Sequence, residues 1–478
     1  MPSSLHLEPA AQIIDRTDEL ALVEDKLDII RFGSTVFQAI INFFGVVGIG
    51  KTELLHQIER HCQDKKVPVV FADLGAETYQ APAMGRLAIM EAIIAVASQE
   101  NSAPPRQFRR KSDELRQFLA QQMDEDGNLK DDEMSNQQRE EQGRAVEREF
   151  QVFMTKRLGK NGRQPLVLLF DETDKARPEF LDWLEETIVS PLVRTDRVLA
   201  IFAGRSLVRW KRFEVRRRVH QYRLMPFSIA QTREQIQNYA GLSDKIIRLT
   251  FGHPFANRRV AEQVQLIEIR ENETITEANF DKYRLRLMEE LANILIHEYI
   301  LQDVPGDLKG AFKVISTLRQ FDVNALRVIL PAFLPSQFKG KGGGYYLSMI
   351  ARMVETTLVE WDSAKKGYAL DPTIRKMLAL HIQLSDYKQY LRINEAAIAL
   401  YEDWIARIPE NRSGFMIEWL YHRSNVLLVQ GKSDQEIGRE LGKGFGSYLE
   451  EFYKGEDGTS TAMKILEELK NDRDMDED

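Results

Sequence analysis

The sequence contains a single cysteine, Cys62, and no long uninterrupted hydrophobic run. One cysteine excludes an internal disulfide framework and a zinc site built from several cysteines, and it is typical of a reducing compartment. The most apolar stretch, residues 35–50, is broken by Gln38 and Asn42 and ends in glycines, so it predicts a buried strand and a loop rather than a membrane span. The first residues lack the basic segment and apolar core of a signal peptide. We therefore expect a cytoplasmic protein that does not associate with membranes.

An excess of basic charge is also lacking. Lys and Arg total 65 against 73 Asp and Glu, which gives a formal net charge of -8. This balance argues against a protein that coats nucleic acid through bulk charge, although it allows a local basic face. The eight histidines include no pair at the helical spacing of a metal site. With 43% apolar residues over 478 positions, we expect a globular protein of about two to four domains.

Short apolar, β-rich segments recur in the first half of the chain, and helical patterns separate them. These segments are 36–44, 67–74, 166–171, 198–203 and a fifth near 220–224. Such alternation is typical of a parallel sheet covered by helices. We therefore predict an α/β domain at 10–227. An acidic insertion at about 99–150 interrupts it, and its polar composition predicts a solvated segment that is helical or disordered.

Helices dominate after residue 228, with one exception. The exception is a unit in which three helical segments precede a hairpin, at 311–319, 324–333, 345–356 and 358–370. Three helices followed by a hairpin indicate a winged helix. We predict a helical lid, a winged helix, a helical domain and an acidic tail at 228–305, 306–378, 379–470 and 471–478. Asp371 is expected to cap the helix after the hairpin.

The strongest functional motif follows the first apolar strand. Gly45-Val46-Val47-Gly48-Ile49-Gly50-Lys51-Thr52 fits the phosphate-binding P-loop pattern, and a helical pattern begins at Glu53. Glycines allow backbone amides to curl around phosphates, the lysine reaches the β- and γ-phosphates, and the threonine hydroxyl binds Mg²⁺. We therefore expect the nucleotide to be held by Gly45, Gly48, Ile49, Gly50, Lys51, Thr52 and Glu53.

A second carboxylate source for magnesium stands at the end of a later strand. Leu166–Phe170 is apolar and runs directly into Asp171 and Glu172. Asp171 would hold Mg²⁺ through water, and Glu172 would polarise the attacking water as the general base. Asp174 is read as a helix cap and is left out of the catalytic set.

An arginine follows the next strand. The strand Val198–Ala203 is followed by Gly204 and Arg205. In a sheet where this strand lies between the P-loop strand and the Asp171 strand, Arg205 would face the γ-phosphate. We therefore assign Arg205, with Lys51 and Glu172, to the catalytic set. Further basic residues crowd 209–223, which indicates a contact between protomers or a nucleic-acid face.

The order of these motifs resembles the STAND signal-transduction ATPases, near their NB-ARC and bacterial regulator branches, over residues 10–375. The segments that carry the resemblance are Ile14-Asp15-Arg16-Thr17-Asp18-Glu19-Leu20, Phe44–Thr52, Phe170-Asp171-Glu172-Thr173-Asp174, Ala203-Gly204-Arg205, Leu224-Met225-Pro226-Phe227-Ser228 and Gly252-His253-Pro254. The resemblance implies that Arg16 and Pro254 flank the adenine and that the winged helix closes over the nucleotide. Two positions depart from the family: Asp15 replaces a glycine, and Leu370 replaces the histidine that contacts ADP in NB-ARC proteins.

These observations predict an α/β P-loop NTPase with an AAA+-like parallel sheet, followed by a helical lid, a winged helix and an all-α module. It would bind ATP or ADP with Mg²⁺ and hydrolyse ATP slowly. The resemblance implies that ATP drives a conformational change or homo-oligomerisation that regulates an effector protein on another chain. Two alternatives stay open: a DNA-binding AAA+ initiator resembling origin-recognition ATPases, and a scaffold that binds ATP without turnover. Three features count against the first: the acidic net charge, Gly204-Arg205 where initiators favour a polar asparagine, and Gly252-His253-Pro254. Glu172 counts against the second.

Overall fold

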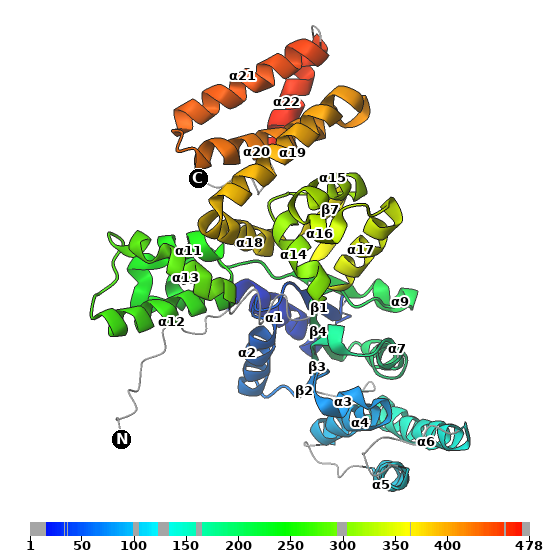
Figure 1. The fold of residues 1–478 in the computed structure, drawn as a ribbon. Helices are drawn as coiled ribbons and strands as arrows, with labels where there is room; N and C mark the ends of the chain where they lie inside the picture. Colours follow the sequence, from blue (N-terminus) through cyan, green and yellow to red (C-terminus); the bar gives the residue numbers. More distant parts are fainter. Residues whose placement is uncertain are drawn as a thin grey trace. The chain divides into compact units, whose positions relative to one another are not determined.

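The computed structural model describes residues 16–32, 34–35, 37–98, 105–122, 133–158, 165–293, 304–363, 365–453 and 456–470 (Figure 1). The chain forms two compact units, Ile13–Met225 and a second that includes Pro226–Asp478. Asp15 of the first motif, the tail at 471–478 and parts of the predicted insertion and lid lie outside the described residues. No helix in these ranges is both long enough and apolar enough to cross a bilayer.

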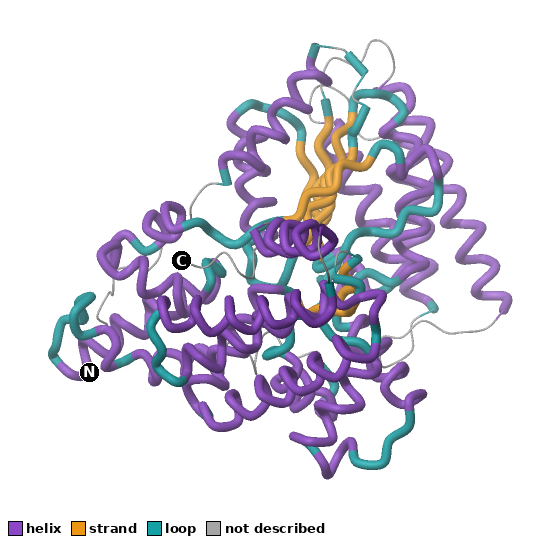
Figure 2. Tube along the Cα trace, turned by 90° about the horizontal axis from the view of Figure 1, so that it is seen from above, coloured by secondary structure: helices purple, strands orange, loops and turns teal. Residues whose placement is uncertain are grey.

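The first unit contains a five-stranded parallel sheet with the strand order β2-β3-β4-β1-β5. The strands are β1 (Ile40–Phe44), β2 (Val69–Asp73), β3 (Leu166–Asp171), β4 (Val198–Gly204) and β5 (Val219–Arg223). Figure 2 shows the strands side by side with helices around them. Every residue of β3 and β4 is buried, as expected for central strands covered on both faces. The predicted α/β class is confirmed.

Helices that lie before and between the strands in the sequence cover this sheet. They include α1 (Thr17–Arg31), α2 (Lys51–Asp64), α4 (Pro82–Ser98) and α8 (Ser190–Val193). Helix α2 packs against β2, β3 and β4, and α4 packs against β2. The side chains of Leu55, Ile58 and Cys62 repeat at helical spacing along α2 and are fully buried. Burial of this face fixes the helix that begins at the P-loop.

The described part of the acidic insertion is helical. Helix α5 (Arg106–Gln121) packs on α6 (Glu133–Leu158), which also packs on α4. Val146, Phe150, Met154 and Leu158 follow one another four residues apart and are buried. This apolar stripe holds α6 onto the domain although the preceding segment is strongly polar.

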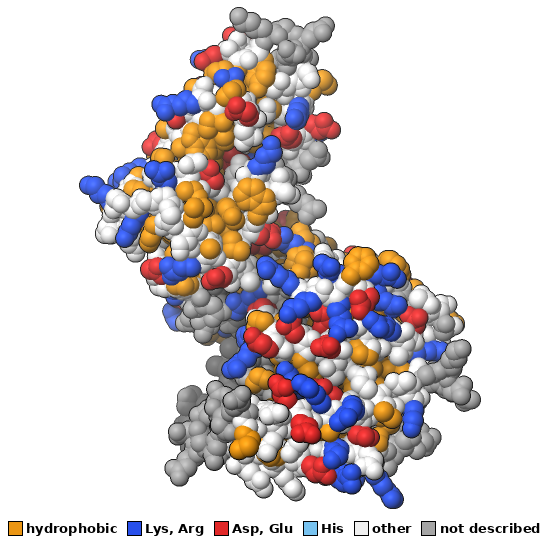
Figure 3. Space-filling view, turned by 90° about the vertical axis from the view of Figure 1, so that its right-hand side faces the viewer, with side chains coloured by type: hydrophobic (Ala, Val, Ile, Leu, Met, Phe, Trp, Pro, Cys, Tyr) orange, Lys and Arg blue, Asp and Glu red, His pale blue; other side chains and the backbone are white. Residues whose placement is uncertain are grey.

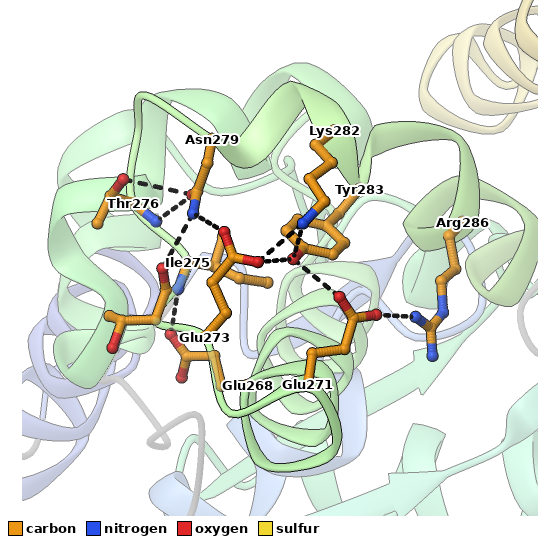
Figure 4. A network of polar contacts seen from close by, with 10 residues as sticks. Glu268, Glu271, Glu273, Ile275, Thr276, Asn279, Lys282, Tyr283 and Arg286 are labelled. Atoms are coloured by element: carbon orange, nitrogen blue, oxygen red, sulfur yellow. Dashed lines mark hydrogen bonds and ion pairs between the residues drawn. The ribbon is translucent and has the colours of Figure 1, made fainter.

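In the second unit, helices α10 (Ile229–Gln235), α11 (Ser243–Thr250), α12 (Pro254–Glu271) and α13 (Arg284–Leu291) pack together in the region of the predicted lid. Figure 4 shows the polar network that closes the loop between α12 and α13. The Tyr283 hydroxyl lies 2.9 Å from Glu271 and 2.8 Å from Glu273, whose carboxylate also pairs with Lys282 at 2.8 Å.

The winged-helix elements are present. They are α14 (Gly306–Ile315), α15 (Val323–Phe333), the short α16 (Pro335–Phe338), α17 (Gly343–Glu355), β6 (Val359–Asp362) and β7 (Gly367–Leu370). The two strands are antiparallel, and Val359 pairs with Leu370. Helix α14 lies at 306–315 rather than at the expected 311–319. The chain leaves the helix before Phe321, which forms a backbone bridge to Tyr368 of β7.

A helical module follows, made of α18 (Pro372–Ser385), α19 (Tyr387–Arg407), α20 (Arg412–Val429), α21 (Asp434–Phe452) and α22 (Glu456–Lys470). The predicted cap is confirmed, since the Asp371 carboxylate accepts hydrogen bonds from the amides of Thr373 (3.0 Å) and Ile374 (3.2 Å). A buried ion pair joins this module to the winged helix: Arg319 Nη2 lies 2.8 Å from Glu418 Oε1, and both side chains are 1% exposed.

Candidate nucleotide-binding site

The P-loop connects β1 to α2 through three glycines with positive φ. Gly45, Gly48 and Gly50 have φ values of 157°, 78° and 96°. Gly50 precedes the first residue of α2 in the left-handed conformation, which a side chain would strain. The loop therefore presents backbone amides at the amino end of a 14-residue helix, where the helix dipole favours an anion.

Lys51 closes this loop. Its Nζ donates to the carbonyl oxygens of Gly45 at 2.8 Å and Val46 at 2.9 Å. Burial lowers the pKa of Lys51 to about 8, and the negative charges of Asp174 and Asp171 oppose the shift. The ammonium thus lies at the centre of the loop, with carboxylates close enough to influence its charge.

The Thr52 side chain, at the start of α2, contacts Asp171 at the end of β3. Asp171, the last residue of β3, is 2% exposed and is hydrogen-bonded to the Thr52 side chain. Burial raises the pKa of Asp171, whereas the bonds from Thr52 and from the Glu172 amide lower it. A hydroxyl and a carboxylate are the hard oxygen donors that Mg²⁺ takes, with waters and phosphate oxygens completing its octahedron. The two residues therefore fit the expected magnesium site.

The position of β4 brings Arg205 to the same edge of the sheet. As anticipated for this residue, β4 lies between β1 and β3, and Gly204 pairs in register with Phe44 at the end of β1. Arg205 and Gly45, the next residues along the two strands, therefore leave the sheet at the same height on its carboxyl edge. The Arg205 amide donates to Asp174 Oδ1 at 2.8 Å, and its Nε lies 3.5 Å from Asp174 Oδ2.

Asp174 is a site residue that the sequence reading missed. It was expected to cap a helix, but its carboxylate binds Arg205 and its charge acts on Lys51. The 3-10 turn Thr173–Lys175 packs closely on the end of β4, because a Cβ on Gly204 would lie 2.2 Å from Thr173 Oγ1. The glycine before Arg205 was the available signal for this close approach.

Glu172 follows Asp171 in the sequence, and its carboxylate lies near the end of β2. Its backbone is in the left-handed region, with φ 50° and ψ 42°. Its Oε2 is 2.6 Å from Lys175 Nζ, and an added Cβ on Gly75, just beyond β2, would lie 1.9 Å from that oxygen. The carboxylate is therefore directed toward the end of β2. Its role as general base stays a prediction.

Arg16 supports the P-loop from its own unit. It is 4% exposed, and its Nη2 donates to the carbonyl oxygen of Ile49 at 2.6 Å, while Nη1 pairs with Glu19 at 3.1 Å. Both terminal nitrogens also lie 3.2 Å from the Met225 carbonyl oxygen. The guanidinium thus fixes the loop backbone, and contact with adenine stays a prediction.

Pro254 belongs to the second unit and is the first residue of α12. Its carbonyl oxygen accepts a hydrogen bond from Gln235 Nε2 at 2.9 Å. The preceding His253 is fully buried and caps the helix by accepting from the Ala256 amide at 3.3 Å. These contacts build a rigid turn at Gly252-His253-Pro254. The adenine role of Pro254 stays a prediction.

The basic cluster after β4 is partly neutralised. Lys211, Arg212 and Arg218 pair with Asp182, Glu186 and Asp196 at 2.6, 2.8 and 3.2 Å. Arg209, Arg216 and Arg217 are exposed. On the face drawn in Figure 3, basic and acidic side chains are interspersed. Within the described residues, no group of three His, Cys, Asp or Glu side chains could hold a metal, so Mg²⁺ would rely on Thr52, Asp171 and the nucleotide.

Comparison with known proteins yields structural similarity only. No protein-family model matches the chain, and no curated protein matches it. Similar solved structures include the ORC2 protein of Aeropyrum pernix in ADPNP–ADP complexes (11% identity, 79% of this chain and 97% of that chain, TM-score 0.33). Others are Cdc6p of Pyrobaculum aerophilum (12%, 81% and 97%, TM-score 0.38) and the RuvB Holliday junction branch migration motor of Thermotoga maritima (14%, 76% and 95%, TM-score 0.36). This similarity concerns the fold alone, and the STAND resemblance and the initiator alternative both stay predictions.

Proposed function

We propose that this chain is a Mg²⁺-dependent ATPase that acts as a nucleotide-controlled switch. The observation that carries the proposal is the convergence of Lys51, Thr52, Asp171 and Arg205 at the carboxyl ends of β1, β3 and β4. In open parallel sheets, ligands bind at this edge. A structural glycine turn would need neither the Thr52–Asp171 contact nor a lysine ammonium held on the loop carbonyls.

Each residue has a distinct task in this proposal. The loop amides and Lys51 bind the phosphates, and Arg16 keeps the loop in shape through the Ile49 carbonyl. Thr52 and Asp171 would hold Mg²⁺, which neutralises charge on the β- and γ-phosphates. Glu172 would accept a proton from the attacking water. Pro254 would contribute to the adenine pocket, as the STAND resemblance implies.

Arg205 is the proposed sensor of the γ-phosphate. It is held by Asp174, and a phosphate could compete for the guanidinium because arginine binds phosphate bidentately. ATP and ADP would then leave the Arg205–Asp174 pair in different states, and only such a differential interaction can shift a conformational equilibrium. Following the STAND resemblance, the shift would move the winged helix, permit self-association and regulate an effector protein.

Nucleic-acid binding through the winged helix is a second candidate. Lys339 and Lys341 are exposed ahead of α17, and Lys366 is exposed in the hairpin. The outward face of α17, however, carries Leu347, which is 61% exposed, and Val354, which is 37% exposed. An apolar face of this kind favours a protein partner over a phosphate backbone.

Replacing the proposed base tests hydrolysis. Glu172→Gln keeps the side-chain shape but removes the proton acceptor, so nucleotide affinity should persist while phosphate release falls at least about 100-fold. Glu179→Gln, an exposed carboxylate at the start of α7 (Pro178–Trp183), is the matched control and should behave as wild type. Equal phosphate release in both variants would remove Glu172 from the mechanism and favour another group that orients the attacking water.

A further inference from the structure

The Glu172 carboxylate is held in a specific place away from the P-loop strand. It forms an ion pair with Lys175, the last residue of the 3-10 turn, with 2.6 Å between Oε2 and Nζ. The same Oε2 atom also packs against Gly75, which is the second residue after β2. The residue adopts left-handed backbone angles that non-glycine residues rarely adopt. Residues held in such sparsely populated conformations cluster at active sites and switch regions.

Strand order shows why this place is unproductive. Going outward from β1, the next strands are β4, β3 and then β2. Neighbouring strands are about 4.8 Å apart, so the end of β2 is roughly 14 Å from the P-loop strand, whereas the end of β3 is roughly 10 Å from it. A general base must come within about 3 Å of the water that attacks the γ-phosphate. The carboxylate is thus turned to the side of β3 that is farther from the phosphates.

Gly75 makes this position available. A Cβ at residue 75 would lie 1.9 Å from Glu172 Oε2 and 3.1 Å from Lys175 Cδ. The carboxylate and the lysine stem therefore share the space that the missing side chain leaves. Gly75 does not have the positive φ that requires glycine, so the close approach of Glu172, rather than the backbone conformation, gives the glycine its importance.

The ion pair between Glu172 and Lys175 is weak enough to be released. The side chains of Glu172 and Lys175 are 36% and 48% exposed, so solvent screens their attraction. Exposed ion pairs of this kind shift an equilibrium by only about two- to five-fold. Asp174, between the two residues, is bound to Arg205. An Arg205 that turns to a phosphate would leave the Asp174 carboxylate to compete for Lys175.

We propose that Lys175 and Gly75 together form a restraint that holds the Glu172 carboxylate away from the phosphates and slows basal ATP hydrolysis. Lys175 is a positioning residue, since it acts through Glu172. The inference rests on the proposed ATPase function and adds a means of regulating it. Release of the carboxylate from β2 lets it turn toward β4, the side on which the P-loop lies.

Two chemically different variants should release the same restraint. Lys175→Gln removes the ion pair, and Gly75→Ala fills the space under the carboxylate without a change of charge. Each should raise kcat about two- to five-fold with the Kd for ATP unchanged. Lys175→Arg keeps the charge and should restore wild-type turnover. Addition of Glu172→Gln to either variant should abolish the gain, because the released group is the base itself.

The measurement is steady-state phosphate release together with calorimetric ATP binding for each variant. Lys156→Ala, an exposed lysine on α6, controls for the loss of a lysine and should match wild type. Turnover that depends on Lys51 in wild type, with no gain in Lys175→Gln and Gly75→Ala, would overturn the restraint but leave the ATPase. Absence of Lys51-dependent turnover from wild type and from both released variants would overturn the ATPase proposal itself.

Discussion

Glu418→Ala should strongly destabilise the second unit, because it leaves the buried Arg319 charge without its carboxylate. Glu418 accepts from Arg319 Nη2 at 2.8 Å and Nε at 3.3 Å, and from Gln320 Nε2 at 3.2 Å. Both charged side chains are 1% exposed. Removal of one partner from a buried pair costs about 3 to 5 kcal/mol, since the remaining charge cannot regain its hydration.

An exposed pair in the same unit provides the control. Arg352 and Asp307 form two contacts of 2.8 Å, but their side chains are 40% and 52% exposed. Asp307→Ala should therefore cost less than about 1 kcal/mol. Glu418→Gln, which keeps much of the hydrogen bonding but not the charge, should fall between the two.

Urea unfolding followed by tryptophan fluorescence measures these differences. Trp404 and Trp419 lie in α19 and α20 and report on the module that contains Glu418. The free energy of unfolding is obtained from the midpoint and slope of that transition. If Glu418→Ala lost no more stability than Asp307→Ala, the buried pair would not join the winged helix to the helical module energetically.

His422 should make the protein sensitive to acid: burial lowers its pKa to about 3 from 6.5, so the unfolded state takes up a proton that the native state refuses, and stability present above pH 6.5 is lost as the pH falls. At pH 5 the loss should be about 2 kcal/mol, and His422→Gln should lose less between pH 7 and pH 5 in urea unfolding; an equal loss would contradict the assignment. Arg205→Ala should bind ATP and ADP but abolish the difference between them in solution scattering with ADP and with a non-hydrolysable ATP analogue. Identical wild-type profiles in the two nucleotides would refute the switch.

The sheet was largely predictable because its signals are local. Strand β3 has the predicted bounds, since five apolar residues run into Asp171. Strand β1 begins at Ile40, later than the predicted start, because a turn at residues 37–38 precedes it; residue 36 lies outside the described residues. Helix α14 was misplaced for a tertiary reason. Residues 316–320 leave the helix, and this brings Arg319 to Glu418, 99 residues away.

The site was predictable where a motif places residues together, and not where it depends on strand order. The P-loop and Asp171 follow from their local patterns. The Asp174–Arg205 contact requires β4 to lie between β1 and β3, and it joins residues 31 apart. The contact of Glu172 with Gly75 likewise depends on β2 being the neighbour of β3. Neither contact has a periodic signal in the sequence.

The central claim is that Lys51, Thr52 and Asp171 form a Mg²⁺-dependent site for ATP, and titration calorimetry tests it most directly. Wild-type protein and Lys156→Ala should bind ATP, and binding should weaken when EDTA removes magnesium. Lys51→Ala should lose at least about tenfold in affinity, because it removes the ammonium at the loop centre that would bind the phosphates. Asp171→Asn should bind ATP with little dependence on magnesium. Equal, magnesium-independent affinities for wild type, Lys51→Ala and Asp171→Asn would contradict the account.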